Sequence, residues 1–316
     1  MKTAVITGST CNIGISLAKE LLGNGYDVFA VVRPGGARND LLKGLCPQAH
    51  IVECELDNID EISNKIKSMG YAAGADEFYH IGWKSDFENP RYNLEGQRIN
   101  KTITEKAVRV AASLNCKKFI GVGSQAECGL VDKPINSKTP DAPITAYAVA
   151  KCETYESCCR LSDELGIDFF WPRLLSEYGP YDRGTLLMLC IDACINRKEL
   201  EMTGAEQIWD YVYADDVARA LYLIVKKGVP KKKYTIASGI GKPLAEYIKT
   251  VSEVFDYPEL LKGIGKRPYA EKEVMYLVGD VSELKHDTGM VFDTDFRKNM
   301  ERIKRGMEKK DIILKS

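Results

Sequence analysis

Short apolar runs alternate with amphipathic helical segments along the first half of the chain. The runs are rich in β-branched and aromatic residues, and they occupy residues 4–7, 28–32, 50–56, 77–82, 119–123 and 167–174. Runs of this length are typical of parallel strands that are buried on both faces. Between the first two runs, Ile13, Leu17 and Leu21 fall on one face of a helix. The alternation predicts βαβ units and therefore an α/β fold with a doubly wound parallel sheet.

A glycine-rich turn, TGSTCNIG, joins the first strand to the first helix. Backbone N–H groups at such a turn approach a pyrophosphate closely, and the helix dipole favours its negative charge. Gly8 allows the tight turn and Gly14 allows close packing of helix on strand, whereas Cys11 stands where the usual GxxGxxG pattern has its middle glycine. We therefore predict a Rossmann-type sheet with a dinucleotide site built from Gly8, Cys11, Asn12, Ile13 and Gly14.

The end of the second strand indicates which dinucleotide is bound. An acidic residue at this point would bind the ribose 2′-hydroxyl of NAD. The strand instead ends in Val32 and Arg33, with Arg38 close behind. A guanidinium suits a 2′-phosphate because it forms charge-assisted and often bidentate hydrogen bonds. The sequence therefore favours NADP as the cofactor, with NAD as the second choice.

A tyrosine and a lysine in the segment TAYAVAK, Tyr147 and Lys151, project from one face of a predicted helix. The lysine ammonium is expected to lower the pKa of the phenol by stabilising the phenolate. A tyrosine tuned in this way exchanges a proton with a carbonyl or alcohol oxygen near neutral pH. Ser124 ends the preceding strand, FIGVGS, at the edge where α/β sheets bind ligands. These three residues form the candidate catalytic set.

In this order, these elements resemble the extended short-chain dehydrogenase/reductase family, which includes the NAD-dependent epimerases and dehydratases. The resemblance runs along nearly the whole chain. It implies that Ser124, Tyr147 and Lys151 are catalytic and that Tyr147 and Lys151 also contact the cofactor. Further cofactor contacts are implied for Glu55 and Leu56, which bracket adenine, for Ile81 and Gly82, in a segment beneath the cofactor, and for Asn100 on the following helix.

The resemblance also implies a division of the chain into two parts. Residues 1–172 form the dinucleotide-binding domain, to which residues 207–238 return, and residues 173–206 and 239–316 form a smaller α/β substrate-binding lobe. After residue 172, amphipathic helices are predicted at 186–197, 217–226, 280–288 and 296–309. The implied substrate contacts are Ser124, Gln125, Ser176, Arg183 and Arg267, the last at a position that contacts the diphosphate of a sugar nucleotide.

The residues after Ser124 separate the reactions of this family. Dehydratases carry Asp–Glu there as acid and base, whereas this chain has Gln125 and Ala126, which cannot do acid–base work. The segments GSQAECG and TGAEQIWDYVYADD resemble nucleotide-sugar 4-ketoreductases. The resemblance implies an NADP-dependent oxidoreductase that reduces a nucleotide-activated 4-keto-6-deoxy sugar. Three alternatives remain: an NAD-dependent nucleotide-sugar 4-epimerase, a reductase of non-sugar carbonyls, and a non-catalytic dinucleotide-binding sensor, which Cys11 and Trp209 motivate.

Composition narrows the partners. The 316 residues carry a formal net charge of −1, which argues against a nucleic-acid partner. No apolar run approaches the roughly 20 residues that span a bilayer, and the start lacks a signal-peptide pattern. We therefore expect a cytoplasmic protein with no membrane partner. The ten cysteines form no CxxC pair, and the three histidines lack suitable cysteine neighbours, so reduced thiols and no metal site are expected.

The family resemblance also implies a homodimer, formed through the helices predicted at 100–113 and 148–165. On the second helix, Tyr155, Cys158, Leu161 and Leu165 form an apolar stripe at helical spacing. Such a stripe either faces a second copy of the chain or packs on the chain's own sheet.

Overall fold

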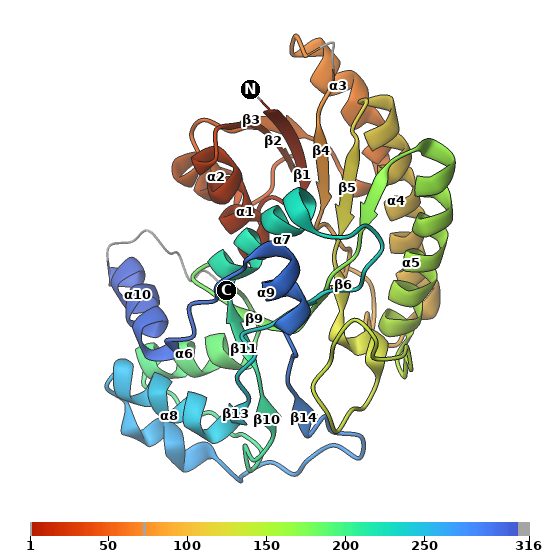
Figure 1. The fold of residues 1–316 in the computed structure, drawn as a ribbon. Coiled ribbons are helices and arrows are strands. Elements are labelled where there is room, and N and C mark those ends of the chain that lie inside the picture. The colour runs from red at the N-terminus through yellow and green to blue at the C-terminus, as the bar shows by residue number, and fades with distance from the viewer. Residues whose placement is uncertain (1, 72–73, 309–316) are drawn as a thin grey trace.

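A six-stranded parallel sheet organises the N-terminal half of the protein. The computed structural model describes residues 2–71 and 74–308. The sheet has the order β3-β2-β1-β4-β5-β7, and every neighbouring pair is parallel (Figure 1). Its strands are β1 (Lys2–Thr7), β2 (Tyr26–Val32), β3 (His50–Glu53), β4 (Glu77–His80), β5 (Lys118–Gly121) and β7 (Asp168–Phe170). The six predicted strands and the doubly wound order are confirmed.

The last two predicted strands are each broken by one or two residues. Beyond β5 the chain continues as β6 (Gly123–Ser124), and beyond β7 it continues as β8 (Arg173–Leu174). Pro172 has no N–H to donate to a ladder, and its carbonyl accepts the N–H of Gly123 at 2.9 Å. In a separate three-stranded sheet, β8 lies between β6 and β12 (Thr235–Ile236) and pairs with both. Ser124 therefore ends β6.

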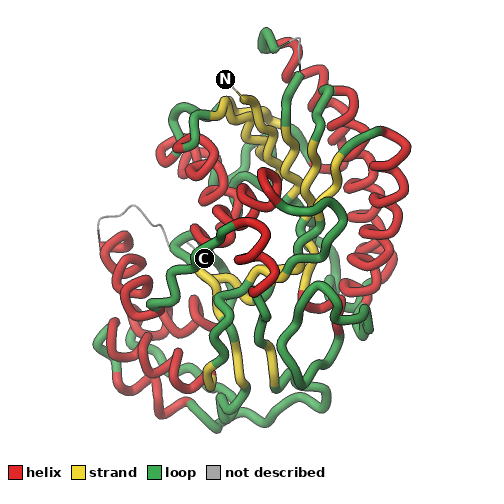
Figure 2. Tube along the Cα trace, in the orientation of Figure 1, coloured by secondary structure: helices red, strands yellow, loops and turns green. Residues whose placement is uncertain are grey.

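Helices cover both faces of the large sheet (Figure 2). On one face, Ile6 of β1 shares a core with Leu17 and Leu221 from two helices. On the other face, Val5 shares a core with Val108, because successive strand residues point to opposite faces. The helices are α1 (Asn12–Gly23), α2 (Asn39–Leu45), α3 (Ile62–Ser68), α4 (Leu94–Ser113), α5 (Ala146–Leu165), α6 (Leu186–Asn196), α7 (Ala214–Lys227), α8 (Leu244–Val254), α9 (Ser282–Thr288) and α10 (Phe296–Glu308), with 3-10 turns η1 (Leu56–Glu61), η2 (Gln125–Cys128) and η3 (Pro258–Gly263).

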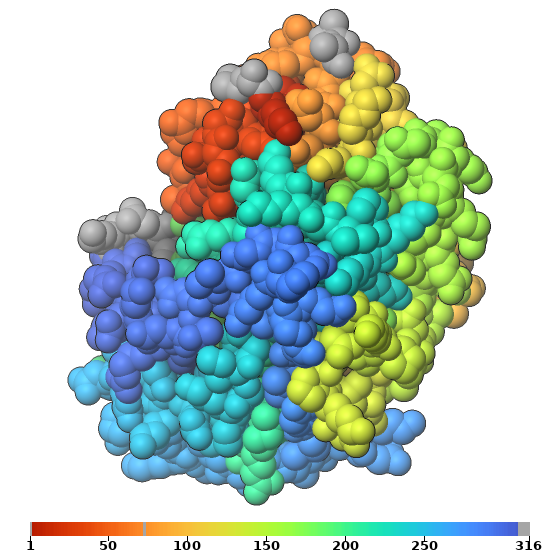
Figure 3. All heavy atoms as spheres, in the orientation of Figure 1, coloured from red at the N-terminus to blue at the C-terminus, as the bar shows by residue number. Residues whose placement is uncertain are grey.

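The later part of the chain builds a second core. Two small sheets form there: β9 (Ser176–Tyr178) pairs with β11 (Tyr211–Tyr213), and β10 (Ile208–Trp209) lies between β13 (Lys242–Pro243) and β14 (Tyr276–Leu277). Helices α6, α8 and α10 enclose a third apolar cluster that includes Ile191, Ile248 and Met300. In Figure 3 the teal segment of α7 lies between the red N-terminal part and the blue C-terminal part, and α7 packs beside α1. The predicted domain limits stay predictions, and residues 309–316 lie outside the described residues.

The apolar stripe on α5 packs inside the chain. Cys158 and Leu161 are buried, and Tyr155 and Leu165 pack against the same core cluster as Phe169 of β7. The stripe therefore serves the chain's own sheet, so a homodimer would need other residues of α4 and α5. The homodimer itself stays a prediction.

All ten cysteines are free thiols, as their spacing predicted. Within the described ranges, every helix is too short or too polar to cross a membrane.

Candidate active site

The glycine-rich turn lies between β1 and α1, at the carboxyl edge of the large sheet. Gly8 has a φ of +72°, and a Cβ there would lie 2.7 Å from the backbone N of Gly82. A Cβ on Gly14 would lie 2.2 Å from the carbonyl oxygen of Gly8. Side chains are therefore excluded at both positions, because the turn touches the segment after β4 and α1 folds against the turn. This bare cradle at a helix N-terminus fits the pyrophosphate of a dinucleotide.

Cys11 replaces the middle glycine without backbone strain. Its φ of −78° and ψ of 170° are extended backbone that any residue adopts. The thiol caps α1, since Sγ accepts the N–H of Gly14 at 3.3 Å. Burial raises the pKa of the Cys11 thiol to about 11. Cys11 is therefore a neutral helix cap, and Asn12 and Ile13 follow it as buried residues of the first helical turn.

A cavity of about 300 Å³ opens beside the turn. Four basic side chains share its lining, although three different parts of the chain supply them. The residues that matter for a cofactor are Gly8, Arg33, Arg38, Glu55, Leu56, Lys84 and Arg183. This concentration of positive charge suits an anionic ligand.

The two arginines after β2 have different partners. Arg33 is exposed and forms ion pairs of 3.6 Å with both Glu55 and Asp86. Arg38 is half-buried and donates from Nη2 to the carbonyl of Tyr181 at 2.8 Å. Its Nε is buried and has no hydrogen-bond partner in the described chain, and burial lowers its pKa. An unpaired guanidinium N–H beside this cavity fits an anionic oxygen, so Arg38 joins Arg33 as a candidate cofactor contact.

The segment after β4 runs beside the glycine-rich turn. Ile81 donates its N–H to the carbonyl of Thr7 at 3.2 Å, and Gly82 lies against the side chain of Leu56. Asn100 reaches the segment from α4: its Oδ1 accepts the N–H of Lys84 at 2.6 Å, and its Nδ2 donates to the Lys84 carbonyl at 3.0 Å. Asn100 therefore fixes this backbone, while the contact of each residue with a cofactor stays a prediction.

Ser124, Tyr147 and Lys151 converge where β6 ends and α5 begins. The side chain of Ser124 lies near that of Tyr147 and lowers the pKa of its phenol. Nζ of Lys151 lies 5.6 Å from the centroid of the Tyr147 ring. Thr145 caps α5 by accepting the N–H of Ala148 at 3.2 Å, which fixes the helix that carries both residues. The structure thus brings the three predicted residues together.

The electrostatics of this group differ from the sequence-based expectation. Burial raises the pKa of Tyr147 to about 12, against the smaller lowering effect of Ser124. Burial lowers the pKa of Lys151 to about 7, which Glu127 partly opposes. Nζ of Lys151 donates to the Val122 carbonyl at 2.7 Å and lies 3.4 Å from the ring centroid of Trp83. The expected lowering of the phenol pKa by Lys151 is not met here, because burial, together with the charge of Glu127, outweighs the lowering by Ser124 and Arg91.

The carboxylate three residues after Ser124 is held in the core. Glu127 is fully buried, and its Oε1 accepts the N–H of Ser124 at 2.9 Å and the indole N–H of Trp171 at 3.0 Å. Its Oε2 lies 3.3 Å from Nε of Arg173 and 3.7 Å from Nζ of Lys233. Glu127 therefore anchors η2 and is unavailable for acid–base catalysis.

Three side chains lie close enough together to bind a metal ion, but their partners make them part of an ion-pair network. Glu127, Asp141 and Cys152 could together reach one ion. Arg173 pairs with both carboxylates, and Nζ of Lys233 lies 2.7 Å from Asp141. These two cations already balance the two carboxylates. The expected lack of a metal site stays a prediction.

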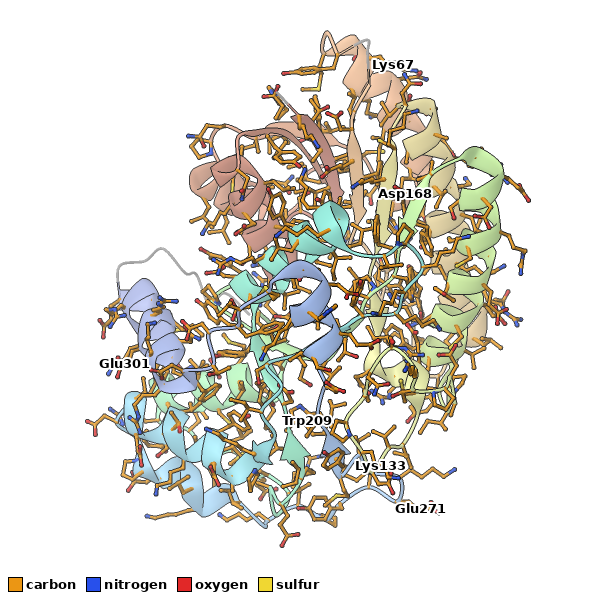
Figure 4. The ribbon with its side chains drawn as sticks, in the orientation of Figure 1. Lys67, Lys133, Asp168, Trp209, Glu271 and Glu301 are labelled. Atoms are coloured by element: carbon orange, nitrogen blue, oxygen red, sulfur yellow. The ribbon has the colours of Figure 1, made fainter. Side chains whose placement is uncertain are left out.

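A second cavity, of about 470 Å³, opens in the later part of the chain. Ser176 and Arg267 both line it, so two of the predicted substrate residues share one cavity. Trp209, labelled in Figure 4, lines it as well and donates from its indole to Oγ of Ser176 at 2.7 Å. Gln125 opens η2 beside the catalytic group. Arg183 lies instead in the cavity beside the glycine-rich turn.

Sequence reasoning missed two residues of the site: one at the second cavity and one beside the catalytic group. Glu177 accepts a hydrogen bond from Nδ2 of Asn12, whose Oδ1 accepts the N–H of Tyr181 at 3.1 Å. Burial, followed by the charge of Asp182, raises the pKa of Glu177 to about 8. Trp83 is the second residue, since it contacts the catalytic lysine. The available signals were a carboxylate inside an otherwise uncharged strand and a tryptophan directly after the segment His-Ile-Gly.

A glycine-rich turn on a doubly wound sheet, with a Ser–Tyr–Lys group at its edge, defines a dinucleotide-binding protein of the Rossmann type. The chain belongs to the NAD dependent epimerase/dehydratase family, whose model matches residues 4–237. The family resemblance inferred from the sequence is thus confirmed. Since the family is described as NAD-dependent, the prediction that NADP is the preferred cofactor gains no support from this match.

Similar proteins act on several nucleotide sugars. The dTDP-glucose 4,6-dehydratase of Escherichia coli is 28% identical over 52% of this chain and 49% of its own length, so the chain spans about half of that relative. The CDP-abequose synthase of Salmonella typhimurium is 24% identical over 95% of this chain and 96% of its own length.

Two solved structures share the fold. The UDP-glucose 4-epimerase of Thermotoga maritima, solved with UDP-glucose, has a TM-score of 0.84 at 21% identity, covering 98% of this chain and 99% of that one. The dTDP-glucose 4,6-dehydratase of Streptomyces venezuelae, solved with NAD, has a TM-score of 0.82 at 16% identity and covers 97% of both chains. These likenesses support the Rossmann-type fold.

Proposed function

We propose that the protein is an oxidoreductase of nucleotide-activated sugars that reduces a 4-keto-6-deoxy sugar with NADPH. The observation that carries this proposal is that none of the three residues directly after Ser124 offers a free carboxyl group. Gln125 and Ala126 come first, and Glu127 is bound to Arg173 in the core. Eliminating water requires an additional acid and base, whereas reducing a ketone requires one proton donor.

The catalytic group can supply that proton. A bound nicotinamide dinucleotide provides the hydride that adds to the carbonyl carbon. Tyr147 is protonated at neutral pH, since its pKa is about 12, and its O–H donates the proton to the carbonyl oxygen. The Ser124 hydroxyl, which lies near Tyr147, orients that oxygen. The Lys151 ammonium holds the cofactor ribose, and its charge would stabilise the phenolate that forms once the proton has left.

Two features support binding of the cofactor. The side-chain-free cradle at Gly8 and Gly14 admits a pyrophosphate. The unpaired Nε of Arg38, beside Arg33, supports a further phosphate and therefore NADPH. Glu55 at the same cavity supports NAD instead, because a carboxylate accepts hydrogen bonds from a ribose hydroxyl.

The second cavity supports a nucleotide diphosphate on the substrate. Trp209 offers a flat apolar surface, and the exposed guanidinium of Arg267 suits a diphosphate. The likeness to CDP-abequose synthase over nearly both full chains agrees with a nucleotide-sugar substrate. An NAD-dependent 4-epimerase is the second candidate, favoured by Glu55 and by the family description.

Turnover of a substrate panel separates the two candidates. The 4-keto-6-deoxy sugars of CDP, dTDP, GDP and UDP are incubated with NADPH, and the loss of NADPH absorbance is followed. A reductase consumes one NADPH per sugar and yields a product two mass units heavier. An epimerase leaves NADPH unchanged, converts 4-hydroxy sugar nucleotides and releases NAD on denaturation, which would overturn the reductase proposal.

The variant Tyr147→Phe tests the proposed proton donor. It removes only the phenol oxygen, so NADPH should still bind while turnover falls roughly 10²–10⁴-fold. Tyr222→Phe is the matched control, because it removes a phenol oxygen from α7, where the ring packs edge-on against Tyr26. Full activity of Tyr147→Phe would defeat the catalytic assignment.

A further inference from the structure

The catalytic lysine has an unusual neighbour in the segment after β4. Nζ of Lys151 lies 3.4 Å from the ring centroid of Trp83, closer than to the rings of Tyr147 at 5.6 Å and Trp171 at 5.3 Å. The Trp83 ring also meets the Tyr147 ring edge-on, with centroids 6.0 Å apart. Trp83 therefore contacts both proposed catalytic side chains on α5.

Helix α4 holds the indole in place. The indole N–H of Trp83 donates to Oε1 of Gln97 at 2.8 Å, and Nε2 of Gln97 donates to the Pro90 carbonyl at 2.6 Å. Asn100 fixes both backbone polar groups of the next residue, Lys84. The ring is thus anchored at its polar edge while its face meets the ammonium.

The surroundings of Lys151 leave its charge with little other support. Glu127 from η2 is the charged group in the described chain that favours the ammonium, and it is itself ion-paired. His80 from β4 is neutral, because burial lowers its pKa to about 3. On its own helix Lys151 faces Tyr147, and the Val122 carbonyl accepts one of its N–H groups. An aromatic face is attractive to a cation, most strongly where water is excluded.

We propose that Trp83 is a positioning residue for catalysis, whose indole face keeps the Lys151 ammonium charged and in place beside Tyr147. This inference rests on the proposed function only for the meaning of the turnover measurement. Lys151 in the charged form holds the cofactor ribose and strengthens Tyr147 as a proton donor. Loss of the ring should therefore make Lys151 lose its proton at lower pH.

The pH profile of three variants tests this role. Trp83→Leu removes the aromatic face, and the alkaline limb of kcat should move to lower pH by about one unit, the size expected from a desolvated cation–π contact. Trp83→Phe restores a smaller face and should recover most of the shift. Gln97→Met frees the indole edge and should shift the limb in the same direction by less. Tyr257→Leu is the control, since it removes a ring that Arg197 covers at 5.2 Å, away from the catalytic group.

A binding measurement separates this inference from the proposed function. Calorimetric titration of NADPH between pH 6 and 10 reports the charge of Lys151 without any sugar substrate. The dissociation constant of Trp83→Leu should rise at a pH about one unit lower than that of the wild type, and Trp83→Phe should fall between them. If Trp83→Leu does not fold, Trp83→Phe and Gln97→Met carry the test. Identical pH dependence in the wild type and the folded variants would overturn the role of Trp83, whatever the substrate proves to be.

Discussion

Replacing Glu127 by glutamine tests how strongly the ion network beneath the active site stabilises the fold. All of its hydrogen-bonding neighbours are donors: the Ser124 N–H and the Trp171 indole on Oε1, and Arg173 on Oε2. A glutamine can keep its oxygen toward the first two. Its NH₂ group then faces the guanidinium of Arg173, so the buried arginine loses one counter-charge and gains a clash of donors.

The size of the effect follows from the remaining partners. Removing one member of a buried ion pair costs about 3–5 kcal/mol. Asp141 still pairs with Arg173, so we expect a loss near the lower limit, about 3 kcal/mol. Because folded proteins are stable by only about 5–15 kcal/mol, the urea midpoint should fall by about 1 M or more.

Urea unfolding followed by circular dichroism measures this loss. Glu153→Gln is the matched control, since Glu153 pairs with Arg98 at 2.7 Å on the surface, where such pairs contribute about 0.2–1 kcal/mol. The kcat of folded Glu127→Gln should also begin to fall at a lower pH than that of the wild type, because the Lys151 ammonium loses the charge that favours it. Similar midpoints for the two variants would refute the reasoning.

Four further outcomes are expected. Cys11→Gly should retain NADPH binding, because only a helix cap is lost, whereas Cys11→Leu should abolish binding by crowding the turn. Calorimetry measures the NADPH affinity of both variants, and tight binding by the leucine variant would exclude the turn as the cofactor site. Lys151→Met should become less stable than the wild type as pH rises. The folded pKa of Lys151 is about 7 and the unfolded value is 10.5, so the unfolded wild type binds more protons between these values and wild-type stability increases there. The difference in the free energy of unfolding between variant and wild type, measured by urea, should change by about 2 kcal/mol from pH 7 to pH 9, with exposed Lys138→Met as the control for net charge. Arg33→Asp should narrow the preference for NADPH over NADH, and equal dissociation constants in the wild type would remove the basis for that preference. Light scattering should give the mass of a dimer, and a constant monomeric mass across micromolar concentrations would contradict it.

Local patterns carried most of the fold and the catalytic group. Runs such as the one ending at Val32 have no polar residues to place on a solvent face, so they identify buried strands directly. The spacing of Tyr147 and Lys151 fixes their shared helix face. The breaks before Ser124 and Arg173 were not predicted, because the apolar pattern continues through Pro172 while its missing N–H ends the pairing.

Contacts between distant segments account for what was not predicted. Asn12 and Glu177 are 165 positions apart, and periodicity gives no distance between such segments. The side chain of Arg183 follows β9 in the chain, and the packing of that segment places Arg183 beside Arg38. The pKa of Lys151 depends on its burial, and its contact with Trp83 joins two distant segments; the helix spacing alone determines neither.

The hydrogen bond between Asn12 and Glu177 has a thermodynamic consequence. Asn12 starts the helix that faces the predicted pyrophosphate, and Glu177 lines the cavity of about 470 Å³ in the other half of the molecule. A ligand that displaces either side chain perturbs the other, so occupancy of the two cavities should be heterotropically linked. Linkage is reciprocal. If a bound nucleoside diphosphate changes the affinity for the dinucleotide, the bound dinucleotide changes the affinity for the nucleoside diphosphate by the same factor, commonly about 5–150-fold. Glu177→Gln keeps an acceptor for Asn12, whereas Glu177→Leu removes it and should uncouple the two binding events.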